Sequence, residues 1–191
     1  SRHLGMDIMD YMPAPVRIRP KQVETKKVVE GRDTIETIHT PAGTLRQVRR
    51  TADDGNASYL LEHLVKTPAD LPILAAVFED EVVEPAPKIE KEIADRQALI
   101  GQDGMLMCFL PGTPLGMMYR VYSGVETLAY LCADAPEALA DLFRVMEENY
   151  QQQFRLSASS AADIFVGMDD TSTTTISPAM ESEMESARKL S

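Results

Sequence analysis

The first third of the chain carries short runs rich in Val, Ile and Thr, which are typical of half-exposed strands. Gly31-Arg32 and Pro41-Ala42-Gly43 separate these runs, and the second break predicts a hairpin turn in which Gly43 takes a positive φ. The pattern therefore predicts an antiparallel meander within residues 16–66. Its strands are expected at Val23–Glu30, Asp33–Thr40, Thr44–Thr51 and Tyr59–Val65.

Helical spacing replaces this pattern after Lys66. Thr67-Pro68-Ala69-Asp70 predicts a capped helix start, and Ala86-Pro87 opens a second helix that Gly101 closes. Two more helices are predicted to begin at Ser123-Gly124 and at Pro136. The last of them has an apolar stripe at helical spacing, which we expect to pack on the outer face of a sheet. This stripe consists of Leu139, Leu142, Phe143, Met146, Tyr150 and Phe154.

Two strongly apolar runs lie between the helices, at Met105–Leu110 and Ile164–Gly167, and predict buried parallel strands of one sheet. Strands that recur after helices are typical of βαβ units. The sequence therefore predicts an α/β fold with a single domain over residues 1–180, in which the meander is followed by βα units from residue 67. Residues 181–191 form a polar tail.

The candidate chemistry lies in the loops that follow these two strands, where α/β proteins usually bind their ligands. Asp169 and Asp170 come directly after Ile164–Gly167, in a loop rich in Thr and Ser. The Pro111–Gly116 loop follows the other strand and leads to Tyr119. The alternative is structural, with the two acids as solvated loop residues or helix caps and Tyr119 as a half-buried aromatic residue.

The composition narrows the choice of partners. The 191 residues include 30 acidic and 19 basic side chains, for a net charge of −11, which argues against nucleic acid or an anionic membrane as the main partner. No apolar run approaches the ~18 residues that span a bilayer, and the N-terminus lacks a signal-peptide pattern, so we expect a cytoplasmic protein. Cys108 and Cys132 lie in apolar surroundings with no histidine close to either, and they predict neither a disulfide nor a metal site.

Three segments together resemble the uroporphyrinogen decarboxylase superfamily, which also contains the corrinoid-dependent methyltransferases. The first is His39–Leu45 together with Glu62–Leu71, and the second is Phe109–Pro114 followed by Tyr119. The third runs from Ala162 through the two acids to Ser177-Pro178-Ala179-Met180. The likeness covers roughly residues 4–180, and its specificity lies in the order and spacing of the segments.

The resemblance implies a TIM-type (β/α)8 barrel, which takes ~250 residues. We therefore expect a partial barrel with the meander as an insertion near its N-terminal end. The family's arginine-rich loop would precede Ser1, and the zinc ligands of its methyltransferases would follow Ser191. Because a partial barrel leaves sheet edges and apolar faces uncovered, we also expect a homodimer or aggregation.

By this resemblance, the expected function is the cofactor-independent decarboxylation of a porphyrinogen acetate side chain, or a related reaction on a tetrapyrrole. The resemblance implies Asp169, Asp170 and Tyr119 as catalytic residues, with Pro111, Gly112, Thr113 and Met168 in contact with the small-molecule substrate. One alternative is a zinc-dependent methyltransferase that acts on a methylated corrinoid protein. The other is a truncated, non-catalytic barrel fragment, and we expect no decarboxylation by the 191 residues alone.

Overall fold

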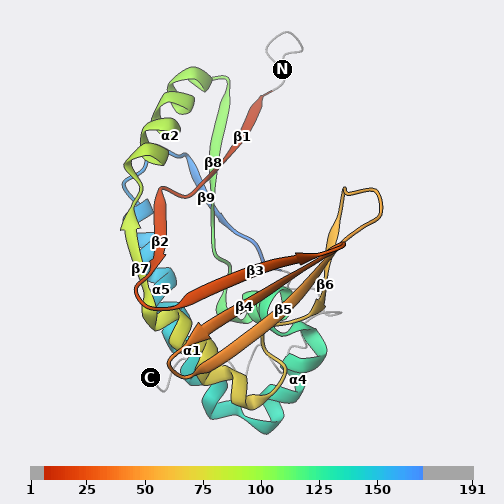
Figure 1. Cartoon of the computed structure of the whole chain (residues 1–191). Coiled ribbons are helices and arrows are strands. Elements are labelled where there is room, and N and C mark those ends of the chain that lie inside the picture. The colour runs from red at the N-terminus through yellow and green to blue at the C-terminus, as the bar shows by residue number, and fades with distance from the viewer. Residues whose placement is uncertain (1–6, 170–191) are drawn as a thin grey trace.

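The computed structural model describes residues 7–169, which have a mixed α/β fold, as predicted, with three small open sheets (Figure 1). The sheets contain β1 (Ile8–Pro13), β8 (Gly104–Leu110) and β9 (Ile164–Gly167); β2 (Val16–Pro20) and β7 (Glu81–Pro85); and the meander of β3 (Glu24–Glu30), β4 (Asp33–Thr40), β5 (Gly43–Thr51) and β6 (Ser58–Glu62). The helices are α1 (Leu71–Asp80), α2 (Pro87–Ile100), α3 (Pro114–Met117), α4 (Gly124–Asp134) and α5 (Pro136–Ser157), with a 3-10 turn η2 (Pro68–Asp70) and a π-helical turn η3 (Met118–Tyr122). Within residues 7–169, no helix is long and apolar enough to cross a membrane.

The parallel sheet has the strand order β1-β8-β9. Met107 of β8 pairs with Ile164 of β9 in parallel register, which confirms that the two apolar runs are neighbours in one sheet. Residues of β8 alternate between faces, so that Leu106 and Cys108 are fully buried while Phe109 is 41% exposed. The prediction of two buried strands is wrong for β9, because it forms an edge of the described sheet and leaves Ile164 exposed.

Helix α2, rather than α5, shares a core with this sheet. Ile93 and Ile100 of α2 join Leu106 and Cys108 of β8 and Met12 of β1 in a small core cluster. The apolar stripe of α5 instead belongs to a larger core with α1, α4 and the meander, except for Phe154, which is exposed. The expected packing of α5 on the sheet is therefore wrong. Apolar spacing shows that a helix has a buried face, but it does not show which element covers that face.

The meander forms as predicted, although β6 ends at Glu62 rather than at Val65. Gly43 has a φ of 150° in the turn between β4 and β5, and a Cβ atom there would stand only 2.7 Å from Cδ1 of Ile73 in α1. Ile38 and Leu45 turn into the larger core, whereas every residue of β3 is exposed. The meander thus packs on the helices through β4 and β5 and leaves β3 at its outer edge.

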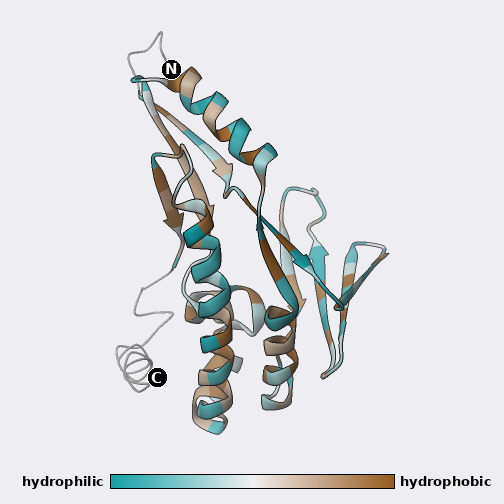
Figure 2. Cartoon of the chain, turned by 90° about the vertical axis from the view of Figure 1, so that its left-hand side faces the viewer, coloured by the Kyte–Doolittle hydropathy of each residue, from teal (hydrophilic) through white to brown (hydrophobic). Residues whose placement is uncertain are grey.

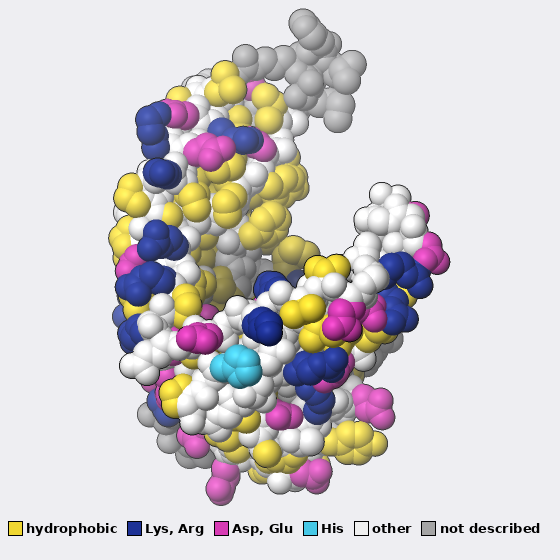
Figure 3. All heavy atoms as spheres, viewed as in Figure 1, with side chains coloured by type: hydrophobic (Ala, Val, Ile, Leu, Met, Phe, Trp, Pro, Cys, Tyr) yellow, Lys and Arg dark blue, Asp and Glu magenta, His cyan; other side chains and the backbone are white. Residues whose placement is uncertain are grey.

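The molecule is hollowed on one side, between the arm that carries the parallel sheet and the meander (Figure 3). Hydrophobic side chains gather along the inner face of that arm (Figure 3). The register of the parallel sheet puts five exposed apolar residues on one of its faces: Met9, Tyr11, Met105, Phe109 and Ile164. The strands of this sheet are mainly apolar, whereas α2 and α5 mix polar and apolar residues along their length (Figure 2). Parallel sheets are usually covered on both faces. The described strands form open sheets, and the partial barrel stays a prediction.

Candidate functional site

The loops that follow β8 and β9 meet at the carboxyl edge of the parallel sheet. The carboxylate of Asp169 accepts a hydrogen bond from the backbone N–H of Thr113, with 2.8 Å between the nitrogen and Oδ2. Its Oδ1 lies against Gly116 and Gly112, where an added Cβ atom would stand only 1.6 Å and 2.6 Å away, respectively. Glycine at both positions therefore permits the close approach of the carboxylate, and Asp169 joins two loops that are distant in sequence.

The Pro111–Gly116 loop is fixed by a helix cap. Oγ1 of Thr113 accepts a hydrogen bond from the backbone N–H of Gly116 at 3.0 Å, and Pro114 occupies the first turn of α3. In the next turn, η3, the guanidinium of Arg120 donates to the backbone oxygen of Met168. The structure thus brings Gly112 and Thr113, which follow Pro111 in the sequence, together with Met168 and Asp169 at this edge.

Tyr119 lies in η3 and is 6% exposed, as part of the larger core. Its neighbour Arg120 reaches Met168, so this turn adjoins the loop that follows β9. Tyr119 is thus more buried than the half-buried aromatic residue of the structural alternative, and its catalytic role stays a prediction. Asp170 lies outside the described residues.

The exposed face of the sheet carries an aromatic pair that the sequence pattern did not indicate. Tyr11 of β1 and Phe109 of β8 stack with their ring centroids 5.5 Å apart and their planes 8° from parallel. Both side chains are substantially exposed, at 49% and 41%. The pair therefore places exposed aromatic surface on this face of the sheet, and aromatic side chains pack well against apolar rings. The pair escaped prediction because it forms only where β1 lies beside β8, which is remote in the sequence.

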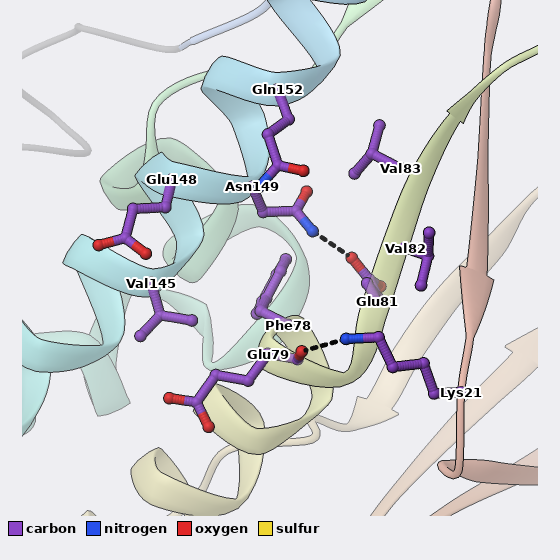
Figure 4. Close-up of a pocket in the computed structure, with 10 residues that line it drawn as sticks. All are labelled: Lys21, Phe78, Glu79, Glu81, Val82, Val83, Val145, Glu148, Asn149 and Gln152. Carbon is purple, nitrogen blue, oxygen red and sulfur yellow. Dashed lines mark hydrogen bonds between the residues drawn. The ribbon is translucent and has the colours of Figure 1, made fainter.

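A second cleft, of about 420 Å³, lies between the end of α1, strand β7 and helix α5 (Figure 4). Oε2 of Glu81 accepts a hydrogen bond from Nδ2 of Asn149 at 2.8 Å, and Oδ1 of Asn149 accepts one from Nε2 of Gln153 at 2.8 Å. Asn149 and Gln153 are each only 4% exposed, so buried partners fix the orientation of the carboxyl group. The cleft is lined by Lys21, Phe78, Glu79, Glu81, Val82, Val83, Val145, Glu148, Asn149 and Gln152.

Burial raises the pKa of Glu81 to about 7. The hydrogen bond from Asn149 opposes this effect, and the negative charge of Asp80 adds to it. At neutral pH the carboxyl group is therefore divided between its protonated and ionised forms. A carboxyl group poised in this way, in a cleft, is able to exchange a proton with a ligand.

Two tyrosines, the buried Tyr150 and the partly buried Tyr122, lie next to Glu81. The rings of Tyr122 and Tyr150 both meet Phe78 edge to face, with centroids 5.9 Å and 6.0 Å away. Burial raises the pKa of Tyr122 to about 12, and the charge of Glu81 contributes. Burial also raises the pKa of Tyr150, with smaller contributions from Tyr122, Glu81 and Asp169. Tyr150 therefore lies within electrostatic reach of both the cleft and the carboxyl edge of the sheet.

Among residues 7–169, no group of three or more His, Cys, Asp or Glu side chains is arranged to hold a metal ion. Both cysteines are free thiols, and Cys108 is buried as expected, whereas Cys132 is only partly buried.

Comparison with known proteins finds no match to this chain among protein-family models, curated proteins or solved structures. The resemblance to the uroporphyrinogen decarboxylase superfamily consequently rests on the motifs quoted above and on their order.

Proposed function

We propose that this chain carries part of the ring-binding site of a uroporphyrinogen decarboxylase-like protein of the cytoplasm, at the carboxyl edge of β1, β8 and β9. The supporting observation is the exposed stacked pair of Tyr11 and Phe109, on the sheet whose edge holds the carboxylate of Asp169. A porphyrinogen joins four pyrrole rings that carry acidic side chains. Its apolar rings suit an aromatic surface, and its pyrrole N–H groups suit a carboxylate.

The proposed reaction removes an acetate carboxylate without a cofactor. A proton is added to the ring carbon that bears the acetate, which leaves a positive charge on the pyrrole. The bond to the carboxylate then breaks, its electrons neutralise the ring, and CO2 leaves. The resulting methylene group takes up a proton to become a methyl group, while the ring carbon returns its own. Asp169 or Asp170 would stabilise the cation, and the hydroxyl of Tyr119 would assist the proton transfer.

Asp169 also has a structural contact, because it holds the N–H of Thr113. A loss of function in Asp169→Asn would therefore not separate the two roles. The aromatic pair is a better test, since Phe109 is exposed and can be changed without opening the core. Tyr130 of α4 is 62% exposed and offers a matched control on another surface.

The test is a fluorescence titration with uroporphyrin I, the stable oxidised form of a porphyrinogen, in ~0.15 M salt. Salt at this level shortens the range of repulsion between the anionic ligand and the acidic protein to ~8 Å. We expect saturable binding that Phe109→Ser weakens at least tenfold and Tyr130→Ser leaves unchanged. Absence of saturable binding, or equal loss in both variants, would refute the proposed site.

The two alternatives give different results in parallel assays. Methyl transfer from methylcobalamin to a thiol in the presence of zinc, without porphyrin binding, would favour the methyltransferase. A non-catalytic fragment that keeps the ring-binding surface would bind uroporphyrin I, and because no decarboxylation is expected of the 191 residues alone, loss of CO2 from uroporphyrinogen I would exclude this alternative.

A further inference from the structure

The cleft at Glu81 has the features of a small-molecule site and is separate from the carboxyl edge of the sheet. It is built by α1, β7 and α5, and its volume of about 420 Å³ suits a small ligand. Four of its lining residues are apolar: Phe78, Val82, Val83 and Val145. An alkyl group that packs against these side chains would be transferred from water to an apolar surface, which is favourable.

Glu81 supplies a polar group of fixed geometry beside these four apolar side chains. Asn149 holds one carboxyl oxygen at 2.8 Å, and Gln153 holds Asn149 in turn (Figure 4). A carboxyl group whose partners are already ordered loses little conformational freedom when it binds a ligand. This preorganisation distinguishes Glu81 from the exposed acids elsewhere on the chain.

The charged groups around the cleft favour a cation over an anion. Glu79 and Glu148 also line the cleft. Glu148 forms an ion pair with Arg144, with 3.0 Å between the carboxylate oxygen and the guanidinium nitrogen. The ammonium group of Lys21 lies 3.5 Å from the backbone oxygen of Glu79. The carboxylate of Asp80 accepts hydrogen bonds from the backbone N–H groups of residues 21–23. The two tyrosines next to Glu81, Tyr122 and Tyr150, are neutral at physiological pH. The cleft therefore has more negative than positive groups.

We propose that this cleft binds the ammonium group of a small alkylamine, with Glu81 as the counter-ion and the valines against the alkyl chain. The proposal is independent of the ring-binding site, because the two sites share no lining residue.

Binding of a cation next to Glu81 must release a proton. Burial raises the pKa of the empty carboxyl group to about 7, so this group keeps its proton to a higher pH than an exposed carboxyl group does. An ammonium ion within ~4–6 Å favours the ionised form of a carboxyl group and lowers its pKa. Amine binding should therefore release part of a proton at pH 6.5 and almost none at pH 8.5, where Glu81 is already ionised.

The test is calorimetric titration of the chain with n-butylamine hydrochloride at pH 6.5 and pH 8.5, in two buffers of different ionisation enthalpy at each pH. n-Butanol, which has nearly the same shape without the charge, is the control ligand. We expect butylamine to bind at least tenfold more tightly than butanol. We also expect a proton release of ~0.5 or more at pH 6.5 that disappears at pH 8.5.

Two variants locate the site. Glu81→Gln keeps an oxygen for Asn149 but cannot ionise, so it should weaken butylamine binding at least tenfold and remove the proton release. Glu92→Gln removes an exposed acid of α2 that does not line the cleft and should change the affinity by less than about threefold. Equal binding of butanol and butylamine, or unchanged proton release in Glu81→Gln, would overturn the proposal. The buffer comparison on the unaltered chain tests it even if Glu81→Gln fails to fold.

Discussion

Replacement of Glu81 by Gln should stabilise the protein at alkaline pH and not at acid pH. In the unfolded chain this carboxyl group ionises near its ordinary pKa of 4.5, whereas burial raises its pKa in the folded protein to about 7. Between these values the unfolded state releases a proton that the folded state retains, so the free energy of unfolding falls as the pH rises. The full effect is roughly 3 kcal/mol. Solvent in the open cleft reduces this figure, and we expect about 2 kcal/mol.

The measurement is urea unfolding at pH 5 and at pH 8.5, followed by circular dichroism, since the chain has no tryptophan. The quantity of interest is the difference in free energy of unfolding between Glu81→Gln and the unaltered chain. Other acids, such as Asp10, contribute equally to both proteins and cancel from this difference. The difference should move by about 2 kcal/mol in favour of the variant between the two pH values. A difference that does not change with pH would refute the burial of an ionisable carboxyl group at position 81. Glu148→Gln removes an exposed carboxyl group and serves as the control for this measurement.

Three further outcomes are expected. Gly116→Ala should cost about 1–2 kcal/mol in urea unfolding by displacing the Asp169 carboxylate from its hydrogen bond, and the same change should be almost neutral in an Asp169→Ala background. Iodoacetamide followed by mass spectrometry should label Cys132 in the native protein well before Cys108, which is fully buried and whose pKa burial raises. Sedimentation should detect a dimer that Met105→Lys weakens, because Met105 lies on the uncovered apolar face of the parallel sheet, and a monomer at all concentrations would contradict this.

Elements with strong local signals were predicted well from the sequence. Helix α2 begins at Pro87 and ends before Gly101, as the proline and glycine indicated. The turn at Gly43 and the parallel strands β8 and β9 likewise match the pattern. In each case, the signal lies within a few consecutive residues and does not depend on what packs against them.

Strands β1, β2 and β7 were missed because their partners are remote. Tyr11 of β1 pairs with Met107, and Val16 of β2 pairs with Pro85 of β7. Short strands of this kind are stabilised by neighbours that a local pattern does not contain. The stacked pair of Tyr11 and Phe109 was missed for the same reason, since it exists only once β1 and β8 are side by side.

For single side chains too, the sequence does not show which remote residues will surround them. Asp80 and Glu81 are adjacent acids, and nothing in the sequence distinguishes them. Hydrogen bonds from the backbone N–H groups of Val23 and of the two residues before it lower the pKa of Asp80. One residue later, the chain enters β7 and turns Glu81 towards α5, where burial raises its pKa to about 7. The chemistry of Glu81 therefore comes from tertiary packing, whereas Asp169 could be found from its place after a strand.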